Sequence, residues 1–413
     1  MGCPKPEVDV DVHQAWGIFL SHYLAESTFA GATQFEYALI GGLSISQSLL
    51  ISPVVAKSNR YLSTRSTLLI GTVLVFVALF GASYSTKIWH LFLTQGVCFG
   101  WGMGFLYITA TAVLPQWFSR RRSLALGAAS SGAGIGGLAY NLGAGVAAES
   151  IGLKWTYRVL AFCTLAVNLT CSLFLKDRNK IIGPSQRSFD HRELVRVEVI
   201  LVIAWGFFTE LGYIVLLYSL PHYATSIGLT QQQGSVIGAL FNAGLAIARP
   251  IIGHCSDKLG RINVATLMTA LCGVFCLALW APAKGYALLL VFAFLSGTVA
   301  GTFWGTMAPV TAEVVGLKRL PSTFGIIFLA LVLPTTFAEP IALQIVAASG
   351  YLSSQIFVGC MFFLGATSTL FLRSWKISDI ESKALVEHET AYSRQQGQRS
   401  WFAVQRLFNV RRV

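Results

Sequence analysis

Long apolar stretches recur along the whole chain, separated by short segments that carry charges or turn residues. An α-helix needs about 20 consecutive apolar residues to cross a bilayer, whereas a barrel strand needs about ten of alternating polarity. The length of the stretches therefore predicts membrane-spanning helices. We expect these helices at about 37–57, 66–83, 88–113, 123–148, 155–175, 197–221, 232–254, 262–280, 285–312, 321–346 and 351–374.

A shorter apolar piece, at about 12–25, precedes these spans and brings the working total to twelve. Glu7, Asp9 and Asp11 lie directly before it, and an acidic side chain at bilayer depth costs several kcal/mol. We therefore expect a shortened first helix. Two explanations stay open: the sequence is truncated or starts at the wrong place, or the helix is genuinely short.

Composition agrees with a membrane protein and excludes several soluble classes. Hydrophobic residues make up 54% of the chain and charged residues only 12%, about half the share of a soluble domain. A soluble enzyme, a nucleic-acid-binding protein and a disordered scaffold are therefore disfavoured. The expected partners are the lipid bilayer and a small organic solute, with no nucleic acid and no obligate protein partner.

The basic residues predict the orientation in the membrane. If the N-terminus lies in the cytosol and the spans alternate, 25 of the 30 Lys and Arg residues face the cytosol. The net charge of +12 is then explained by the orientation of the chain in the membrane and does not indicate binding of nucleic acid. We expect a multi-pass protein of the plasma membrane with both termini cytosolic.

The spans divide into two similar halves. The predicted organisation is an N-terminal six-helix half at 1–175, a cytosolic linker at 176–196, a C-terminal six-helix half at 197–375 and a basic cytosolic tail at 376–413. Shifting the second half back by 197 residues overlays Gly96, Gly100 and Gly104 on Ala293, Gly297 and Gly301. Small residues at this spacing let helices approach closely, and a two-fold repeated helical bundle is typical of secondary transporters.

Four sequence motifs resemble a known family. They are Gly253-x3-Asp257-Lys258-x-Gly260-Arg261, the segment from Gln116 to Gly137, Arg249-Pro250, and the segment from Pro309 to Leu317. Over about 15–377 the chain resembles the major facilitator superfamily, and specifically its monocarboxylate-porter branch in fungal form. The resemblance implies an all-α membrane protein with 6+6 transmembrane helices, here with a shortened first helix, and transport without enzymatic activity.

The chain departs from that branch at two positions. Monocarboxylate transporters carry an Asp one turn before the Arg of the eighth helix, and this chain has Leu245 there. They also carry a Lys in the first helix, and this chain has no Lys between Lys5 and Lys57. Both differences argue against symport of protons with lactate-like substrates. A coupled proton is still the cosubstrate that we expect if transport is coupled at all. No other cofactor and no metal are expected.

Charged residues within predicted spans are the best pointers to the solute site. Arg249 is the expected anion contact, since its planar fork suits a carboxylate; a structural ion pair or carbonyl cap is the alternative. Glu210 and Glu339 are candidates for proton or substrate contact, or for structural hydrogen-bonded acids. Polar and aromatic residues deep in the spans complete the predicted substrate site: Tyr107, Asn141, Tyr213, Asn242 and Trp304.

A second set of residues is expected to govern gating. Pro334 and Pro340 lie in the eleventh span and overlay Gly137 and Gly143 of the fifth, so both halves could bend there; close packing is the alternative. The loop from Gly253 to Gly260 should form a cytosolic latch, as the resemblance implies. We expect Asp257 to bind the N-terminus of the eleventh span near Leu320–Ser322, and Arg261 to pair with Glu313.

The predicted function is secondary active transport of a small organic solute, a monocarboxylate or other organic anion, by alternating access. Export of a fungal secondary metabolite and a truncated, non-transporting family member are the alternatives. A membrane enzyme is disfavoured because the seven His residues form no ligand-spaced pair. A receptor on the same fold is disfavoured because the chain after Ile377 is short.

Overall fold

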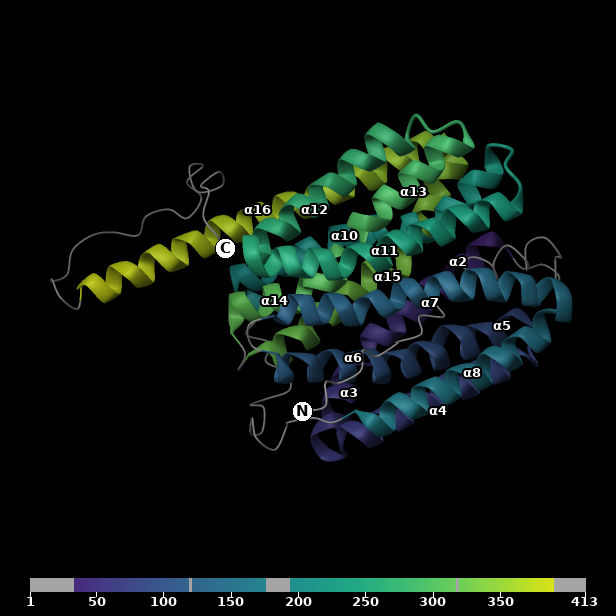
Figure 1. Ribbon diagram of the computed structural model, residues 1–413, viewed down its shortest axis with the longest axis horizontal. Coiled ribbons are helices and arrows are strands. Elements are labelled where there is room, and N and C mark those ends of the chain that lie inside the picture. Colours follow the sequence, from purple (N-terminus) through teal and green to yellow (C-terminus); the bar gives the residue numbers. More distant parts are fainter. Residues whose placement is uncertain (1–32, 119–120, 176–193, 317–318, 390–413) are drawn as a thin grey trace.

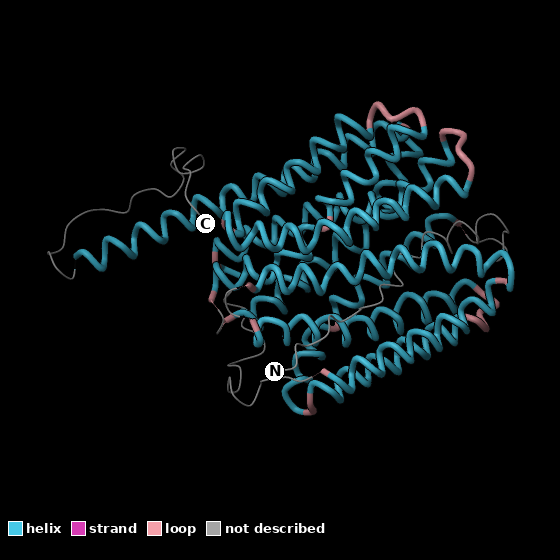
Figure 2. Tube along the Cα trace, in the orientation of Figure 1, coloured by secondary structure: helices cyan, strands magenta, loops and turns pink. Residues whose placement is uncertain are grey.

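The computed structural model describes residues 33–118, 121–175, 194–316 and 319–389. Within these ranges the chain forms helices and no strands (Figure 2). The first half contains α2 (Gln34–Leu50), α3 (Ser52–Tyr61), α4 (Thr64–Ala82), α5 (Ile88–Leu91), the π-helical η2 (Phe92–Cys98), α6 (Phe99–Trp117), α7 (Arg122–Ile151) and α8 (Leu153–Phe174). The second half contains α10 (Val197–Ser226), α11 (Gln231–Leu259), α12 (Arg261–Phe275), the π-helical η4 (Cys276–Trp280), α13 (Tyr286–Ala300), α14 (Thr302–Val315), α15 (Leu320–Ser349) and α16 (Tyr351–Glu389).

Helices of membrane-spanning length occur at all the full-length predicted spans. Ten helical segments of the described residues are long and apolar enough to cross a membrane. The remaining predicted span is α7, a helix of 30 residues that is rich in Gly, Ala and Ser. The apolar piece at 12–25 lies outside the described residues, so a shortened first helix remains a prediction.

Local sequence signals set where several helices begin and end. Thr33 and Glu36 form a capping box at the start of α2, and Thr230 and Gln233 form another at the start of α11. Each box satisfies two backbone N–H groups that a helix start leaves unbonded. Gly260 follows α11 with φ of 101°, a conformation that side chains rarely adopt, and turns the chain directly into α12.

The predicted repeat is confirmed by matching contacts in the two halves. A methyl group on Gly100 of α6 would lie 2.5 Å from the Ser44 carbonyl oxygen of α2, too close to be tolerated. A methyl group on Gly297 of α13 would likewise overlap the Phe241 carbonyl oxygen of α11. Since both members of the second pair lie 197 residues after those of the first, the same helix crossing occurs twice.

The two halves meet along two helix pairs, α7 with α11 and α2 with α15. In Figure 1, α7 and α2 lie between the other helices of the first half and the green to yellow helices of the second. Gly134 of α7 lies against the backbone of α11, where an added methyl group would be 2.5 Å from Ala246 N. Backbones this close leave no room for side chains between the paired helices.

The two prolines of the eleventh span lie inside a continuous helix, and their role in gating stays a prediction. α15 stays helical across Pro334 and Pro340. Gly42 of α2 packs against its Thr336 carbonyl oxygen, and a methyl group there would lie 2.7 Å from that oxygen. Pro340 has no N–H to bond this oxygen, so the close approach of α2 covers a carbonyl that the proline leaves free.

An interruption occurs instead within the tenth span, and the last helix is longer than predicted. Gly301 separates α13 from α14 inside the predicted span 285–312. α16 continues to Glu389 and extends beyond the other helices (Figure 1), so the predicted boundary after residue 375 falls inside a helix.

Candidate functional site

Arg249 is buried where three helical segments meet. Its side chain on α11 is 6% exposed, and its Nη1 donates to the Ser130 carbonyl oxygen of α7. Gly301 provides the space for the guanidinium, since a methyl group there would lie 3.0 Å from both Nε and Nη2. Nε itself has no hydrogen-bond partner within the described residues. Arg249 therefore retains an unused donor at the interface of the two halves.

Glu210 lies opposite this guanidinium on α10. The residue is 1% exposed, and its carboxyl group interacts with the charge of Arg249 and makes a weak hydrogen-bonding contact with the Trp304 indole. Neither carboxyl oxygen makes a hydrogen bond of normal geometry within the described residues. Two opposite charges are thus buried near each other with part of their hydrogen-bonding capacity unused, which is unfavourable unless another group completes it.

An aromatic pair joins the two halves beside these charges. The rings of Tyr107 on α6 and Trp304 on α14 lie 5.7 Å apart, edge to face at 83°. Trp304 is also the aromatic neighbour of Glu210. The structure therefore brings four of the predicted residues into one group, which we call the central cluster: Tyr107, Glu210, Arg249 and Trp304.

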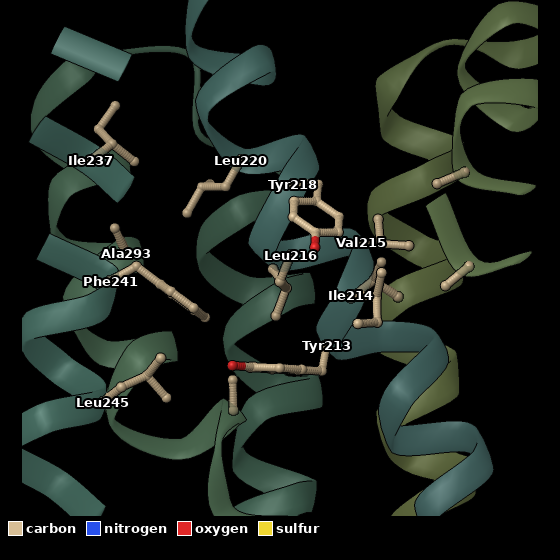
Figure 3. Packing of buried hydrophobic residues seen from close by; sticks show 14 of the residues in the cluster. Tyr213, Ile214, Val215, Leu216, Tyr218, Leu220, Ile237, Phe241, Leu245 and Ala293 are labelled. Carbon is tan, nitrogen blue, oxygen red and sulfur yellow. The ribbon is translucent and has the colours of Figure 1, made fainter. Parts of the chain in front are cut away.

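Two further predicted residues extend the central cluster along their helices. Tyr213 is buried on α10, one turn after Glu210, and its ring reaches toward the helix that carries Phe241 and Leu245 (Figure 3). Asn242 precedes Arg249 by two turns of α11. Its Nδ2 donates to the Gly238 carbonyl oxygen at 3.1 Å, and its Oδ1 has no hydrogen-bond partner within the described residues.

The other predicted residues are not part of the central cluster as described. Glu339 on α15 accepts hydrogen bonds from Ser219 Oγ at 3.0 and 3.2 Å, nine residues beyond Glu210 along α10. Nine residues of helix correspond to about 13 Å. Asn141 and Gly137 lie in α7, and the structure does not describe their side-chain environment, so their predicted roles stay predictions.

Asp257 makes contacts at the place of the predicted latch, but it caps a helix that the sequence did not indicate, and the gating role stays a prediction. Its carboxylate accepts from the backbone N–H groups of Ser123 and Leu124, at 3.4 and 3.1 Å, at the start of α7. The sequence predicts the N-terminus near Leu320–Ser322 as its partner and gives no indication of α7. The sequence carries no signal for which helix starts lie side by side when the two halves close.

The remaining latch contacts agree with the prediction. Arg261 contacts Asp257 at 3.4 Å and Glu313 at 3.4 Å. Gly253 lies against the Ser123 carbonyl oxygen so closely that a methyl group would overlap it. These contacts connect α11, α12 and α14 of the second half to α7 of the first, at the end of the bundle predicted to be cytosolic.

Sequence reasoning missed two parts of the central cluster. The Ser130 carbonyl oxygen is a backbone group, so the residue type at this position gives no indication that it binds Arg249. Gly301 did belong to the predicted stripe of small residues, but that pattern indicates close packing in general and not which side chain is packed. Gly301 overlays Gly104, and Gly104 packs against the Ser48 carbonyl oxygen. That correspondence identifies the pair of helices that approach each other at Gly301, but not the side chain that fills the space.

Comparison with known proteins agrees with this architecture. The sequence model of the Major Facilitator Superfamily matches residues 15–230 and 200–412. The probable transporter MCH2 of Saccharomyces cerevisiae is 33% identical over 377 residues, which cover 89% of this chain and 79% of MCH2. The uncharacterized transporter ESBP6 of the same yeast is 30% identical, over 88% of this chain and 56% of ESBP6.

A more distant relative carries a more specific name. The fujikurins efflux protein of Gibberella fujikuroi is 25% identical, over 86% of this chain and 77% of that protein. The family match covers nearly the whole sequence, and ten helical segments of the described residues are long and apolar enough to cross a membrane. This chain is therefore a multi-pass membrane transporter that belongs to the Major Facilitator Superfamily.

Proposed function

We propose that this transporter carries a small organic anion, a monocarboxylate being the simplest case, by alternating access around the central cluster. The observation that supports this most is the buried Arg249, which has an unused Nε donor at the interface of the halves. A carboxylate is the natural partner of a guanidinium, because it can accept two parallel N–H bonds. Trp304 and Tyr107 offer aromatic surface to the organic part of the solute.

Glu210 gives this proposal a mechanism for proton coupling. A charged Glu210 competes with an anionic solute for Arg249, whereas a protonated Glu210 leaves the guanidinium to the solute. Binding of the anion and of a proton would then favour each other. Leu245 occupies the position of the acid in the eighth helix of monocarboxylate transporters, and Glu210 offers a carboxyl group to the same arginine from the seventh.

The test is counterflow of labelled acetate, lactate and pyruvate in proteoliposomes, with and without an inward proton gradient. We expect counterflow of at least one carboxylate, stimulated by the gradient, and its loss in Arg249→Gln. Arg158→Gln is the matched control, since Arg158 lies over the rings of Tyr84 and Trp155 at 4.8 Å and away from the central cluster. Equal counterflow in Arg249→Gln and wild type would refute the proposed anion contact.

Export of a fungal secondary metabolite is the second candidate, and the named activity of the Gibberella fujikuroi relative favours it. The two candidates differ in the solute and in the direction of net movement. Export would be favoured if the assay showed no counterflow of acetate, lactate or pyruvate and if loaded vesicles extruded a larger acidic metabolite.

We further propose that the protein lies in the plasma membrane with both termini in the cytosol, on the distribution of Lys and Arg. An epitope inserted in the 176–196 linker should be labelled only after the plasma membrane is permeabilised. Labelling on intact cells would reverse the orientation.

A further inference from the structure

Glu339 is a buried carboxyl group that the proposed transport mechanism does not use. It is 4% exposed on α15, next to Pro340. The hydrogen bonds that the structure gives it both come from one neutral group, the Ser219 hydroxyl of α10. Within the described residues it forms no ion pair, in contrast to Glu198, whose carboxylate lies 3.2 Å from Arg196 Nη1.

A carboxylate in this setting is costly if it is charged. Burial removes its hydration, and one hydroxyl donor replaces only part of it. A bound proton removes the charge, while the protonated group can still bond to the Ser219 oxygen. The surroundings of Glu339 therefore favour a proton at this position, on geometry and burial alone.

The other titratable groups near Glu339 lie on the three helices that pack against this part of α15. Glu36 accepts from the Thr33 backbone N–H in the capping box of α2, and the neighbouring side chains of the other helices are neutral phenols and one imidazole. The set is Glu36 and Tyr37 on α2, Tyr218, His222 and Tyr223 on α10, and Tyr351 on α16. None of them offers Glu339 a permanent positive charge.

Two of these groups connect the buried carboxyl to the surface. Tyr351, at the start of α16, interacts electrostatically with Glu339 and is hydrogen-bonded to Nδ1 of His222. His222 is exposed near the end of α10, one turn after Ser219. This end of the bundle is opposite to the Asp257 latch, so it is the predicted outer end.

We propose that Glu339 is a proton-binding site, separate from the central cluster, that exchanges its proton with the predicted outer surface beside Tyr351 and His222. The proton keeps the Glu339–Ser219 contact uncharged and so stabilises the packing of α15 on α10. Loss of the proton to water leaves a buried carboxylate and weakens that packing. The outer ends of these two helices are thereby sensitive to external pH, whichever solute is carried.

Potentiometric difference titration of the purified full-length protein in detergent tests the proposal without a solute. Between mildly acidic and mildly alkaline pH, wild type should release one proton more per molecule than Glu339→Gln. Glu198→Gln is the matched control, since it removes an ion-paired carboxyl group far along α10 and should leave the Glu339-dependent proton release unchanged. Identical curves for wild type and Glu339→Gln, in a folded variant, would overturn the proposal.

A second variant keeps the carboxyl group and changes only its partner. Ser219→Ala removes the hydroxyl that donates to the charged form, so the additional proton should be released at more alkaline pH. Infrared difference spectra should show one protonated carboxyl component more in wild type and Ser219→Ala than in Glu339→Gln. An infrared band that Glu339→Gln does not change would also overturn the proposal. So would a Glu339-dependent signal that responds to sodium concentration and not to pH.

These measurements are independent of the proposed function. A transporter that moves no carboxylate in proteoliposomes can still show the Glu339 titration. Conversely, counterflow that depends on Arg249 can persist in a protein whose Glu339 does not titrate. Failure of either proposal therefore leaves the other standing.

Discussion

At the scale of single residues, the central cluster combines opposite charges with incomplete hydrogen bonding. Arg249 and Glu210 are both almost fully buried, yet Nε and both carboxyl oxygens lack hydrogen bonds of normal geometry within the described residues. Protein interiors usually satisfy buried polar groups. An arrangement that leaves several unsatisfied in one place is expected where a solute supplies the missing partners.

Arg249→Lys separates the role of charge from that of the guanidinium fork. Lysine keeps the positive charge but cannot bond the Ser130 carbonyl oxygen and a carboxylate in the same planar arrangement. The loss of a charged hydrogen bond, about 1.5–3 kcal/mol, predicts a rise in half-saturating carboxylate concentration of about tenfold to a hundredfold. Concentration-dependent counterflow measures this, and an unchanged value would contradict a bidentate contact.

Gly301 is predicted to act by leaving space for Arg249. A methyl group in Gly301→Ala would meet Leu245 Cδ2 and lie 3.0 Å from Arg249 Nε, so the guanidinium must move. Overpacking of this kind costs about 1–3 kcal/mol, and we expect impaired counterflow as well as lower thermal stability in detergent. Gly305→Ala, one turn further along in α14, is the control, because its methyl group would lie 3.8 Å from Ser130 Oγ, an ordinary contact.

At the scale of helices, close backbone packing joins the halves and the latch joins one end. α7 lies against α11 through Gly127, Gly134 and Gly253, each of which contacts backbone atoms of the facing helix. Asp257 then caps the start of α7, where the helix dipole favours a negative charge. Separation of the halves at this end must break the cap and part the glycine contacts.

Gly134→Ala tests the importance of the close packing. The added methyl group would lie 2.5 Å from Ala246 N and 2.7 Å from the Asn242 carbonyl oxygen, both of which are backbone atoms that cannot rotate away. We expect a lower unfolding temperature in detergent and weak transport. Gly143→Ala in the same helix meets nothing within 4 Å and should behave like wild type. Equal stability of the two variants would show that the helices can adjust.

Asp257→Asn is predicted to affect the rate of transport more than substrate affinity. Asparagine can still accept a backbone hydrogen bond, but it loses the charge that pairs with Arg261 and with the α7 dipole. The maximal rate of counterflow should fall several-fold while the half-saturating concentration changes little. Asp379→Asn is the control for charge at this end, since Asp379 pairs with Lys376 on α16. A variant with reduced affinity and normal maximal rate would argue against a latch.

At the scale of the whole molecule, the sequence predicted architecture better than contacts between the halves. Helix lengths and the 197-residue repeat follow from apolar runs and glycine spacing, because both depend on local chemistry. The helix that Asp257 caps, the break at Gly301 and the position of Ser130 beside Arg249 depend on how distant segments meet. Such juxtapositions leave no trace in the order of residues along one chain.

The arrangement of the halves is compatible with the alternating access that we propose. One end of the α7–α11 pair is held by Asp257, and the central cluster lies between the halves, with residues from both. Loss of the latch and closure of the opposite end would move the central cluster from one side of the membrane to the other while its residues remain in place.

Distances between spin labels at the two ends of the α7–α11 pair test this account most directly. One label pair at Arg121 and Lys258 reports the latch end, and another at Ser150 and Gln231 reports the opposite end. When a carboxylate that the counterflow assay shows to be carried is added in proteoliposomes, we predict that one distance lengthens as the other shortens. Distances that change in the same direction, or not at all under any condition of substrate and pH, would contradict alternating access.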